Sequence, residues 1–561
     1  MERIVPTAGP AGPPVVARGP GAGARALGLV AGLVAALCLL PLLAVAIAAA
    51  TGGTDTLRHL AATVLGRYVA TTLILVVAVG GASLVIGTAA AWLVTHARFP
   101  GRRALEVALV LPLAFPAYVL AYAYTHLLDH PGPVQTALRA ATGWGPRDYW
   151  FPEIRSTGGA AAMLALVLYP YVYLLARAAF LQGSGTAFLA ARALGASPLA
   201  AFGRVSLPMA RPAIAGGALL VVMETIADFG TVAYFGVQTF ATGIYQAWFS
   251  MADRGAAAQL AMGLLAFALL VAGLERGTRG ARRSVPAGRR HEAAAPVALR
   301  GWAGWGATAF CAAPVLLGCV IPALALLEMA GGSGQDILSE RYRGFLRNSV
   351  LLASVAALVT LSAAVALGYA QRIRPGSASA AAAGIARLGY AVPGGVIAVG
   401  LLVPFAALDN AVDAFMREAF GVSTGLLVTG SIWLLVAAYA IRFLAAALGA
   451  YEGGQATVNP NMDAAARALG QTPLGALRRV HLPILTPSLM TALLIVFVDT
   501  MKELPATLIL RPFNFDTLAV QAHRLAADER LEGAAVPSLV IVAVGLLPVA
   551  LICRQVGRWR R

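Results

Sequence analysis

The sequence predicts an all-α integral membrane protein with about twelve transmembrane helices in two parallel six-helix repeats. Of its 561 residues, 59% are hydrophobic and only 12% are charged, proportions that soluble domains do not have. Apolar stretches of about 20 residues, long enough to cross a bilayer, recur along the whole chain. One segment occurs twice, once in each half of the chain.

The apolar stretches give the expected spans in order. The first span follows two arginines and ends in small residues, as a signal peptide does, but its apolar run is too long, so we expect an uncleaved helix. The four cysteines lie in or beside spans and predict neither disulfides nor a zinc site. The spans are 26–50, 70–97, 104–125, 158–180, 213–235, 255–274, 302–329, 346–371, 384–408, 424–450, 488–510 and 534–553.

The net charge of +17 is interpreted as an orientation signal and not as a nucleic-acid surface. Arginines cluster at 98–103, 276–290, 372–374 and 554–561. If both termini are cytoplasmic, all these clusters fall on the cytoplasmic side, as the positive-inside rule requires. The expected division is therefore a disordered cytoplasmic tail (1–25), a first six-helix repeat (26–275), a basic cytoplasmic linker (276–300) and a second six-helix repeat (301–561).

The repeated segment aligns Ala190 with Ala465, an offset of 275 residues. Without a gap, 14 of the 26 positions from Ala190 to Ala215 are identical. Each half contains six spans, an even number, so the two copies have the same orientation and are related by an axis along the membrane normal.

The repeated segment predicts a helix, a turn and a second short helix. Gly195 closes the first helix in a left-handed conformation, and Ser197 or its counterpart Thr472 supplies an N-cap oxygen before a proline at the first helical position. We expect the second helix to stop before Leu207 and Pro208, because proline inside a helix costs about 3 kcal/mol. A loop free to vary would not need this punctuation twice, so each half is expected to present a docking element to a partner.

This punctuation resembles the cytoplasmic loop signature of binding-protein-dependent ABC importer permeases, Glu-Ala-Ala, three residues, Gly, nine residues, then Ile-x-Leu-Pro. The resemblance implies the type I ABC importer permease fold and two copies of an ABC ATPase subunit that bind these loops. The position of the signature glutamate is occupied by Leu189 in the first copy and by Ala464 in the second, with Asp463 one place earlier. The polar contact credited to this glutamate in the family is therefore not expected of either residue. The docking residues implied are Ala190, Ala191, Arg192, Gly195, Arg204, Leu207, Pro208, Ala465, Ala466, Arg467, Gly470, Arg479, Leu482 and Pro483.

Four further stretches narrow the resemblance: PLAFPAYVLAYAY from Pro112, LYPYVYLLARAAF from Leu168, DFGTVAYFGVQTF from Asp228 and MKELPATLILRPFNFDTLA from Met501. They resemble the fused permeases of ferric iron uptake systems, which implies a multi-pass protein of the bacterial inner membrane served by an extracytoplasmic iron-binding protein. Thiamine, phosphonate and polyamine importers share much of this frame and remain alternatives.

The sequence contains no phosphate-binding Gly-x4-Gly-Lys-Ser/Thr loop, and Lys502 is its only lysine. We therefore expect a permease and not an enzyme, with no cofactor of its own and with ATP and magnesium on the partner subunits. A twelve-helix secondary transporter is the chief rival, but it would have no reason to repeat a docking element. A membrane-embedded enzyme would need a clustered catalytic set, and no such set is evident.

Four carboxylates lie inside predicted spans. Glu224 and Asp228 repeat as Asp499 and Glu503 at the same offset, and each pair is spaced i, i+4 on one expected helical face. Glu224 lies about 17 Å along the helix from the start of its span, near the middle of the bilayer. Such groups are costly and usually face a cavity, so we predict that Glu224 and Asp228 line a cation path, with Asp499 and Glu503 as weaker participants. Hydrogen bonds that fix helix packing are the alternative. Lys502 can neutralise Asp499 or Glu503, which would leave the second pair structural.

Segments after spans five and eleven also keep the offset, as Phe240 and Thr242 repeat as Phe515 and Thr517. Their outward position predicts an outer gate, with an ordinary packed loop as the alternative. No metal site is firmly assigned. His126, Asp129 and His130 have a spacing that can ligate a metal, but imidazole is a poor ligand for ferric iron. Tyrosines 169, 171 and 173 are expected to pack and hydrogen-bond.

Overall fold

The computed structural model describes residues 22–183, 185–278, 297–336, 339–373, 376–389 and 392–558. Within these ranges, eleven helices are long and apolar enough to cross a membrane, or twelve if one bent pair counts as a span. The strands among the described residues are β1 (Ala97–Arg98) and β2 (Val297–Ala298), which pair in parallel. The structure confirms the predicted all-helical membrane fold.

The helices follow the chain in two series. The first half contains α1 (Ala22–Thr51), α2 (Thr54–Thr63), α3 (Leu65–His96), α4 (Arg102–Ala108), η1 (Leu111–Ala114), α5 (Ala117–Leu128), α6 (Pro133–Thr142), α7 (Thr157–Gly183), α8 (Gly185–Ala193), α9 (Pro198–Ala201), η2 (Phe202–Ser206), α10 (Leu207–Ala227), α11 (Gly230–Tyr234), α12 (Phe240–Phe249) and α13 (Arg254–Thr278). The second contains α14 (Trp302–Val315), η3 (Leu316–Val320), α15 (Ile321–Gly332), α16 (Glu340–Ile373), α17 (Ser377–Leu388), α18 (Gly394–Phe420), α19 (Ile432–Gln455), α20 (Pro460–Ala468), α21 (Pro473–Ala476), η5 (Leu477–His481), α22 (Leu482–Met501), α23 (Pro505–Leu510), α24 (Leu518–Ala527) and α25 (Leu531–Arg558).

Four of the predicted spans are interrupted. The spans expected at 104–125 and 384–408 break before α5 and α18, where Pro116 and Pro393 occupy the N-cap positions. The first of these breaks bends the chain by 95°. The spans expected at 213–235 and 488–510 break at the ends of α10 and α22. Non-helical backbone at membrane depth is tolerated where it is buried in protein or lines a cavity.

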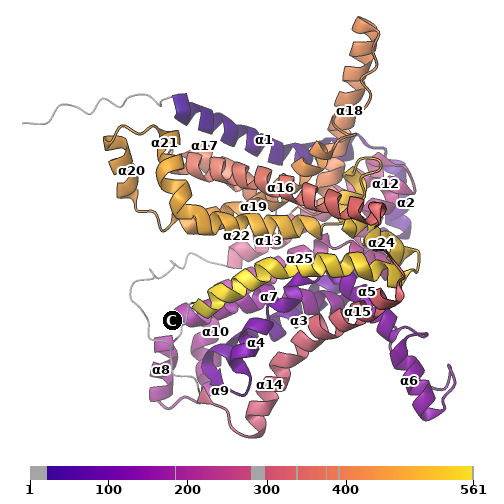
Figure 1. Cartoon of the computed structure of the whole chain (residues 1–561), viewed down its shortest axis with the longest axis vertical. Coiled ribbons are helices and arrows are strands. Elements are labelled where there is room, and N and C mark those ends of the chain that lie inside the picture. Colours follow the sequence, from indigo (N-terminus) through magenta and orange to yellow (C-terminus); the bar gives the residue numbers. More distant parts are fainter. Residues whose placement is uncertain are drawn as a thin grey trace, which may run out of the picture.

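The first and last spanning helices of each half pack on the other half. One hydrophobic core contains residues of α3, α5 and α7 together with α14, α15 and α25, and the other contains residues of α16, α18 and α19 together with α1 and α13. The exchange depends on close approach: a Cβ on Gly400 of α18 would lie 2.4 Å from the carbonyl oxygen of Pro41 in α1. Figure 1 shows α1 beside α16 and α17, and α25 beside α15 and α5.

The two copies of the repeated segment lie on one side of the molecule. In Figure 1, α8 and α9 and the corresponding α20 and α21 are at the left, on the side where the chain ends, while α12 and α24 are at the right. The first repeated loop (185–206) and the second repeated loop (460–481) therefore face the same compartment.

Candidate functional site

The turn inside each repeated loop has the predicted geometry. Gly195 and Gly470 have φ values of +87° and +77°, which favour glycine because a Cβ would be strained there. In each loop the amide after the glycine donates to a carbonyl five residues earlier, Ala196 to Ala191 and Gln471 to Ala466, both at 3.0 Å. This is the hydrogen bond of a Schellman motif, so the helix-closing role of both glycines is confirmed.

The short helices α9 and α21 begin with the predicted caps. Ser197 Oγ accepts a hydrogen bond from the amide of Ala200 at 3.2 Å, and Thr472 Oγ1 accepts one from the amide of Gly475 at 3.1 Å. The bounds of α8, α9 and η2 match those of α20, α21 and η5 at the offset of 275 residues. The two repeated loops thus have the same backbone design.

The predicted stop before Leu207 and Pro208 is wrong. Both short helices continue through a π-helical turn, η2 or η5, directly into a transmembrane helix, and residues 198–227 form one continuous candidate span. A π-turn has i→i+5 hydrogen bonds, and the proline that follows sits in the first turn of α10 or α22, where a missing amide donor is tolerated. A movement of either repeated loop is therefore linked to a spanning helix without an intervening hinge.

The predicted docking residues lie mostly on the surface of the repeated loops. Ala466 is buried, Ala191, Leu207, Pro208 and Leu482 are half-buried, and those that are exposed are Ala190, Arg192, Gly195, Arg204, Ala465, Arg467, Gly470, Arg479 and Pro483.

Exposed leucines occur at matched positions of the two repeated loops, and the sequence reasoning missed them. Leu194 and Leu469 are 89% and 79% exposed, and Leu199 and Leu474 are 70% and 60% exposed. Large apolar side chains grouped on a surface mark contact sites for other molecules. The offset alignment pairs these leucines, but exposure is visible only in the folded chain.

All four predicted carboxylates line one cavity of about 120 Å³ between the two halves. This charged cavity is also lined by Lys502 and Arg442 and by two tyrosines, Tyr118 and Tyr171. Four carboxylates and two cationic groups leave a formal excess of two negative charges. The arrangement can accommodate a small cationic species in a polar environment at membrane depth.

The four carboxylates do not share helical faces as predicted. Helix α10 ends at Ala227, and Asp228 follows it with extended backbone angles. Helix α22 ends at Met501, two residues before Glu503. The i, i+4 spacing therefore spans a helix break in both halves, and the side chains meet because the chain turns there.

Asp228 and Glu503 hold the amino ends of the short helices that follow. Asp228 accepts hydrogen bonds from the amides of Thr231 and Val232 at 3.1 and 3.2 Å, and from the Thr231 hydroxyl at 3.1 Å. Glu503 accepts from the amides of Ala506 and Thr507 at 2.9 and 3.1 Å. These contacts are of the structural kind that was the alternative to a cation path, and a helix amino end stabilises a negative charge.

The other cavity charges come from α19 and from the residue that directly follows α22. Lys502 Nζ lies 2.9 Å from Asp499 Oδ1, so the lysine neutralises a carboxylate as predicted. Arg442 was missed, although an arginine in the predicted span 424–450 is a detectable signal. Its Nη1 atom is buried and has no hydrogen-bond partner among the described residues.

The segments predicted as an outer gate are not paired as the offset suggested. Helix α12 begins after the N-cap Thr239 and α24 after the N-cap Thr517, so the structural counterpart of Thr517 is Thr239 and not Thr242. The connection that precedes α24 is longer, which shifts the offset. Phe240 and Thr517 are buried, while Thr242 and Phe515 are half-buried. Their role as a gate stays a prediction.

The histidine pattern near the end of α5 does not form one helical face. The helix ends at Leu128, and Asp129 pairs with Arg155 at 3.3 Å and accepts the His130 amide at 2.8 Å. In the described part of the chain, no group of three or more histidine, cysteine or acidic residues is arranged to hold a metal.

The tyrosines of α7 have two different surroundings. The Tyr169 hydroxyl donates to the Leu109 carbonyl at 2.8 Å and the Tyr173 hydroxyl to the Glu106 carbonyl at 2.7 Å, which confirms the packing interpretation for both. Tyr171 lines the charged cavity.

Comparisons with known proteins agree with this architecture. Residues 83–277 match the family described as binding-protein-dependent transport system inner membrane component. The chain is 26% identical over 530 residues to the Fe(3+)-transport system permease protein FbpB 2 of Haemophilus influenzae, which covers 92% of this chain and 95% of that protein. It is 25% identical over 504 residues to a probable ABC transporter permease protein, y4fN, of Sinorhizobium fredii, covering 82% and 83%. A putative 2-aminoethylphosphonate transport system permease protein, PhnV, of Salmonella choleraesuis is 28% identical over 134 residues, or 24% of this chain and 50% of that protein.

Proposed function

We propose that this chain passes ferric iron across the bacterial inner membrane as part of an ATP-driven importer. Its residues 83–277 match the inner membrane component of binding-protein-dependent transport systems. The chain is a transport permease, and the similarity to a ferric permease extends over both of its halves. In this proposal ATP and magnesium are bound by two ATPase subunits, and an extracytoplasmic protein delivers the iron.

The observation that carries the proposal is the pair of matching repeated loops on one side of the molecule. Each has the same turn, the same capped short helix and two exposed leucines at the same places. Two equivalent surfaces fit a partner that is present twice, with one apolar socket for each loop. Each short helix continues into a spanning helix, so movement of an ATPase subunit would move α10 or α22.

The same arrangement supports the orientation. The repeated loops lie on the side where the chain ends, and the arginine clusters of the sequence fall in the connections that this orientation places in the cytoplasm. Both termini are then cytoplasmic, and α12 and α24 face the binding protein.

The charged cavity supports a cationic cargo. Its formal excess of two negative charges lies beside non-helical backbone at the ends of α10 and α22. Carboxylate and phenol oxygens are hard ligands, which suit a highly charged cation such as ferric iron. Glu224 and Asp228, with Asp499 and Glu503, would line its path.

A zwitterionic phosphonate is the second candidate, because the cavity also carries two cationic groups. The side chains of Lys502 and Arg442 can bind an anionic group while the carboxylates bind an amine. The similarity to the aminoethylphosphonate permease covers only half of that protein, so it favours this candidate less.

The test is uptake of radioactive ferric iron by vesicles that contain the chain, its ATPase and its binding protein. We expect uptake to require internal ATP, to resist a protonophore and to be unaffected by excess aminoethylphosphonate. Uptake that a protonophore abolishes and that continues without ATP would show a secondary transporter. ATP-dependent uptake of the phosphonate alone would support the second candidate.

A further inference from the structure

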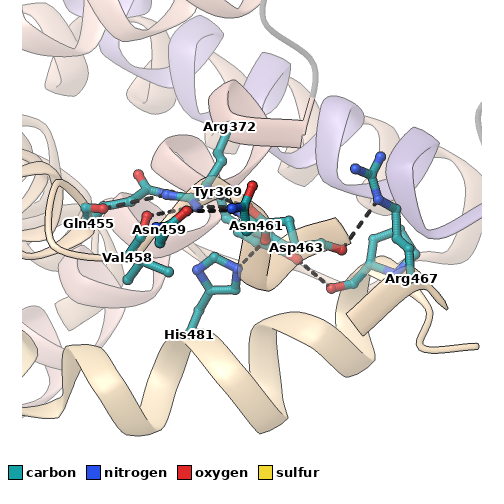
Figure 2. A network of polar contacts seen from close by, with 10 residues as sticks. Tyr369, Arg372, Gln455, Val458, Asn459, Asn461, Asp463, Arg467 and His481 are labelled. Carbon is teal, nitrogen blue, oxygen red and sulfur yellow. Dashed lines mark hydrogen bonds and ion pairs between the residues drawn. The ribbon is translucent and has the colours of Figure 1, made fainter. Parts of the chain in front are cut away.

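The second repeated loop is held to its own half by a charged cluster centred on Asp463 of α20. Asp463 Oδ2 accepts a hydrogen bond from Arg372 Nε at 2.8 Å and lies 2.7 Å from Arg372 Nη2. Asp463 Oδ1 lies 2.6 Å from His481 Nε2. Arg372 is at the end of α16 and His481 is at the end of η5, so one carboxylate joins three segments, as Figure 2 shows.

The end of α16 also contacts the rest of the second repeated loop. Arg372 donates to the Val458 carbonyl at 3.0 Å, just before α20. The Tyr369 hydroxyl donates to the carbonyl of Pro473, the first residue of α21, at 2.6 Å. The Tyr369 ring meets the His481 ring edge-on, with centroids 5.0 Å apart. The spanning helix α16 is therefore bonded to both sides of the turn at Gly470.

The first repeated loop has a different attachment at the corresponding positions. At the offset of 275 residues, Arg372, Asp463 and His481 correspond to Ala97, Phe188 and Ser206, none of which can form an ion pair. In their place is a cluster of rings from α3, α7, α8 and η2. Its members are Trp92, His96, Phe180, Phe188 and Phe202.

This aromatic cluster is tightly packed. The centroids of Phe188 and His96 are 4.7 Å apart, and those of Trp92 and Phe202 are 5.0 Å apart. Phe188 is 2% exposed. Contacts of this kind depend on apolar burial and ring geometry and respond little to salt.

We infer that the two repeated loops, although alike in backbone, are held by different chemistry, so that the second ATPase dock depends on the Arg372–Asp463 ion pair and its contact with His481, and the first does not. This inference rests on the proposed ATPase docking. Asp463 and Arg372 are 27% and 17% exposed, so their ion pair is open to screening by salt. These three residues position the loop and act on the ATPase through it.

Asp463 lies one position before the site of the signature glutamate, which is Ala464 in this chain. Asp463 is directed toward Arg372 and His481 of its own chain, as Figure 2 shows. The competing interpretation is that Asp463 contacts the ATPase directly, as a signature glutamate is expected to do. The two interpretations differ in whether Arg372 and Asp463 act together.

The experiment measures how well each dock protects a cysteine from a maleimide reagent in the assembled complex. Leu199→Cys reports the first dock and Leu474→Cys the second, in a chain whose native cysteines are replaced by serine. We expect Asp463→Asn to accelerate labelling of the second reporter by about fivefold, the effect of losing a partly exposed ion pair, and to leave the first unchanged. Phe188→Ala, the matched change in the first half, should accelerate labelling of the first reporter only.

Two further measurements separate the outcomes. Raising sodium chloride should expose only the second reporter, and Arg372→Gln should add little to Asp463→Asn because the pair acts as a unit. The inference is overturned if Asp463→Asn accelerates labelling equally at both docks, or at neither. Additive effects of Asp463→Asn and Arg372→Gln would instead favour direct contact of Asp463 with the ATPase. If neither reporter is protected in the unmodified complex, the docking proposal itself fails.

Discussion

Lys502 Nζ and Asp499 Oδ1 lie 2.9 Å apart in the wall of the charged cavity, and each side chain is 25% exposed. The only lysine of the chain thus neutralises a carboxylate at membrane depth. An ion that loses its partner at membrane depth keeps an uncompensated charge. Replacing both residues should therefore destabilise the protein less than replacing one of them.

We expect Lys502→Met to destabilise the protein by about 1–3 kcal/mol, because it leaves the Asp499 charge unpaired. The double variant with Asp499→Asn should recover most of this loss. Thermal unfolding of the detergent-solubilised protein gives the comparison. A double variant less stable than either single one would mean that the two charges do not interact.

Removing the Glu224 charge should impair transport without loss of assembly. Glu224→Gln keeps the shape of the side chain and lowers the negative excess of the charged cavity from two to one. We expect the initial rate of iron uptake to fall roughly tenfold, as for an electrostatic contact of about 1.4 kcal/mol. Glu224→Asp, which keeps the charge, is the control. Normal uptake by the Gln variant at wild-type ATPase content contradicts a cation path.

Bulky residues at the two left-handed glycines should weaken binding of the ATPase. Gly195→Val and Gly470→Val force a β-branched residue into positive φ, at a cost of about 1–2 kcal/mol for each turn. Co-purification of the ATPase should fall for each variant and further for the pair. Gly203→Ala, in η2, is the matched control, because a Cβ there meets nothing within 4 Å and φ is not positive. Unchanged co-purification by the double variant would show that these loops are not the docks.

A contact between the two halves on the opposite side should weaken in acid. Arg155 donates to both Glu529 oxygens, at 2.6 and 2.8 Å, and this hydrogen bonding lowers the pKa of Glu529 despite some opposition from burial. A carboxyl whose folded pKa is depressed contributes stability above its ordinary pKa of about 4.3, and this is lost as pH falls through the folded value.

The expected result is a lower unfolding temperature on acidification below about pH 4.3. The Glu529→Gln variant should show a smaller fall, because it lacks the contribution of the Glu529 carboxylate. Unfolding curves for both proteins from neutral to acid pH give the measurement. Parallel curves would show that Glu529 contributes nothing to the pH dependence.

Features set by local sequence were predicted correctly. The turns at Gly195 and Gly470 and the caps at Ser197 and Thr472 depend on a few adjacent residues, so the repeat alone indicated them. The number and class of spans follow from hydropathy, which is also a local property.

Features were missed where the sequence pattern fits two conformations or where distant contacts decide. Asp228 ends α10 because it caps α11, and the same i, i+4 spacing fits an unbroken helix equally well in sequence. The exposure of Leu194 and the position of Arg442 in the cavity wall are decided by packing between segments far apart in the chain. The counterpart of Thr517 was misassigned because alignment at a fixed offset cannot detect a longer connection.

The exchange of α1 and α25 between the two cores bears on how such a chain arose and moves. Two separate half-length chains with this packing would already be interlocked, so joining them end to end adds a covalent link without creating a new interface. A protein cut between Thr278 and Val297 should therefore stay in one piece. If the charged cavity opens by separation of the two cores, the bodies that move apart are two mixed bundles, each built from segments of both halves, and the crossing helices would limit their separation.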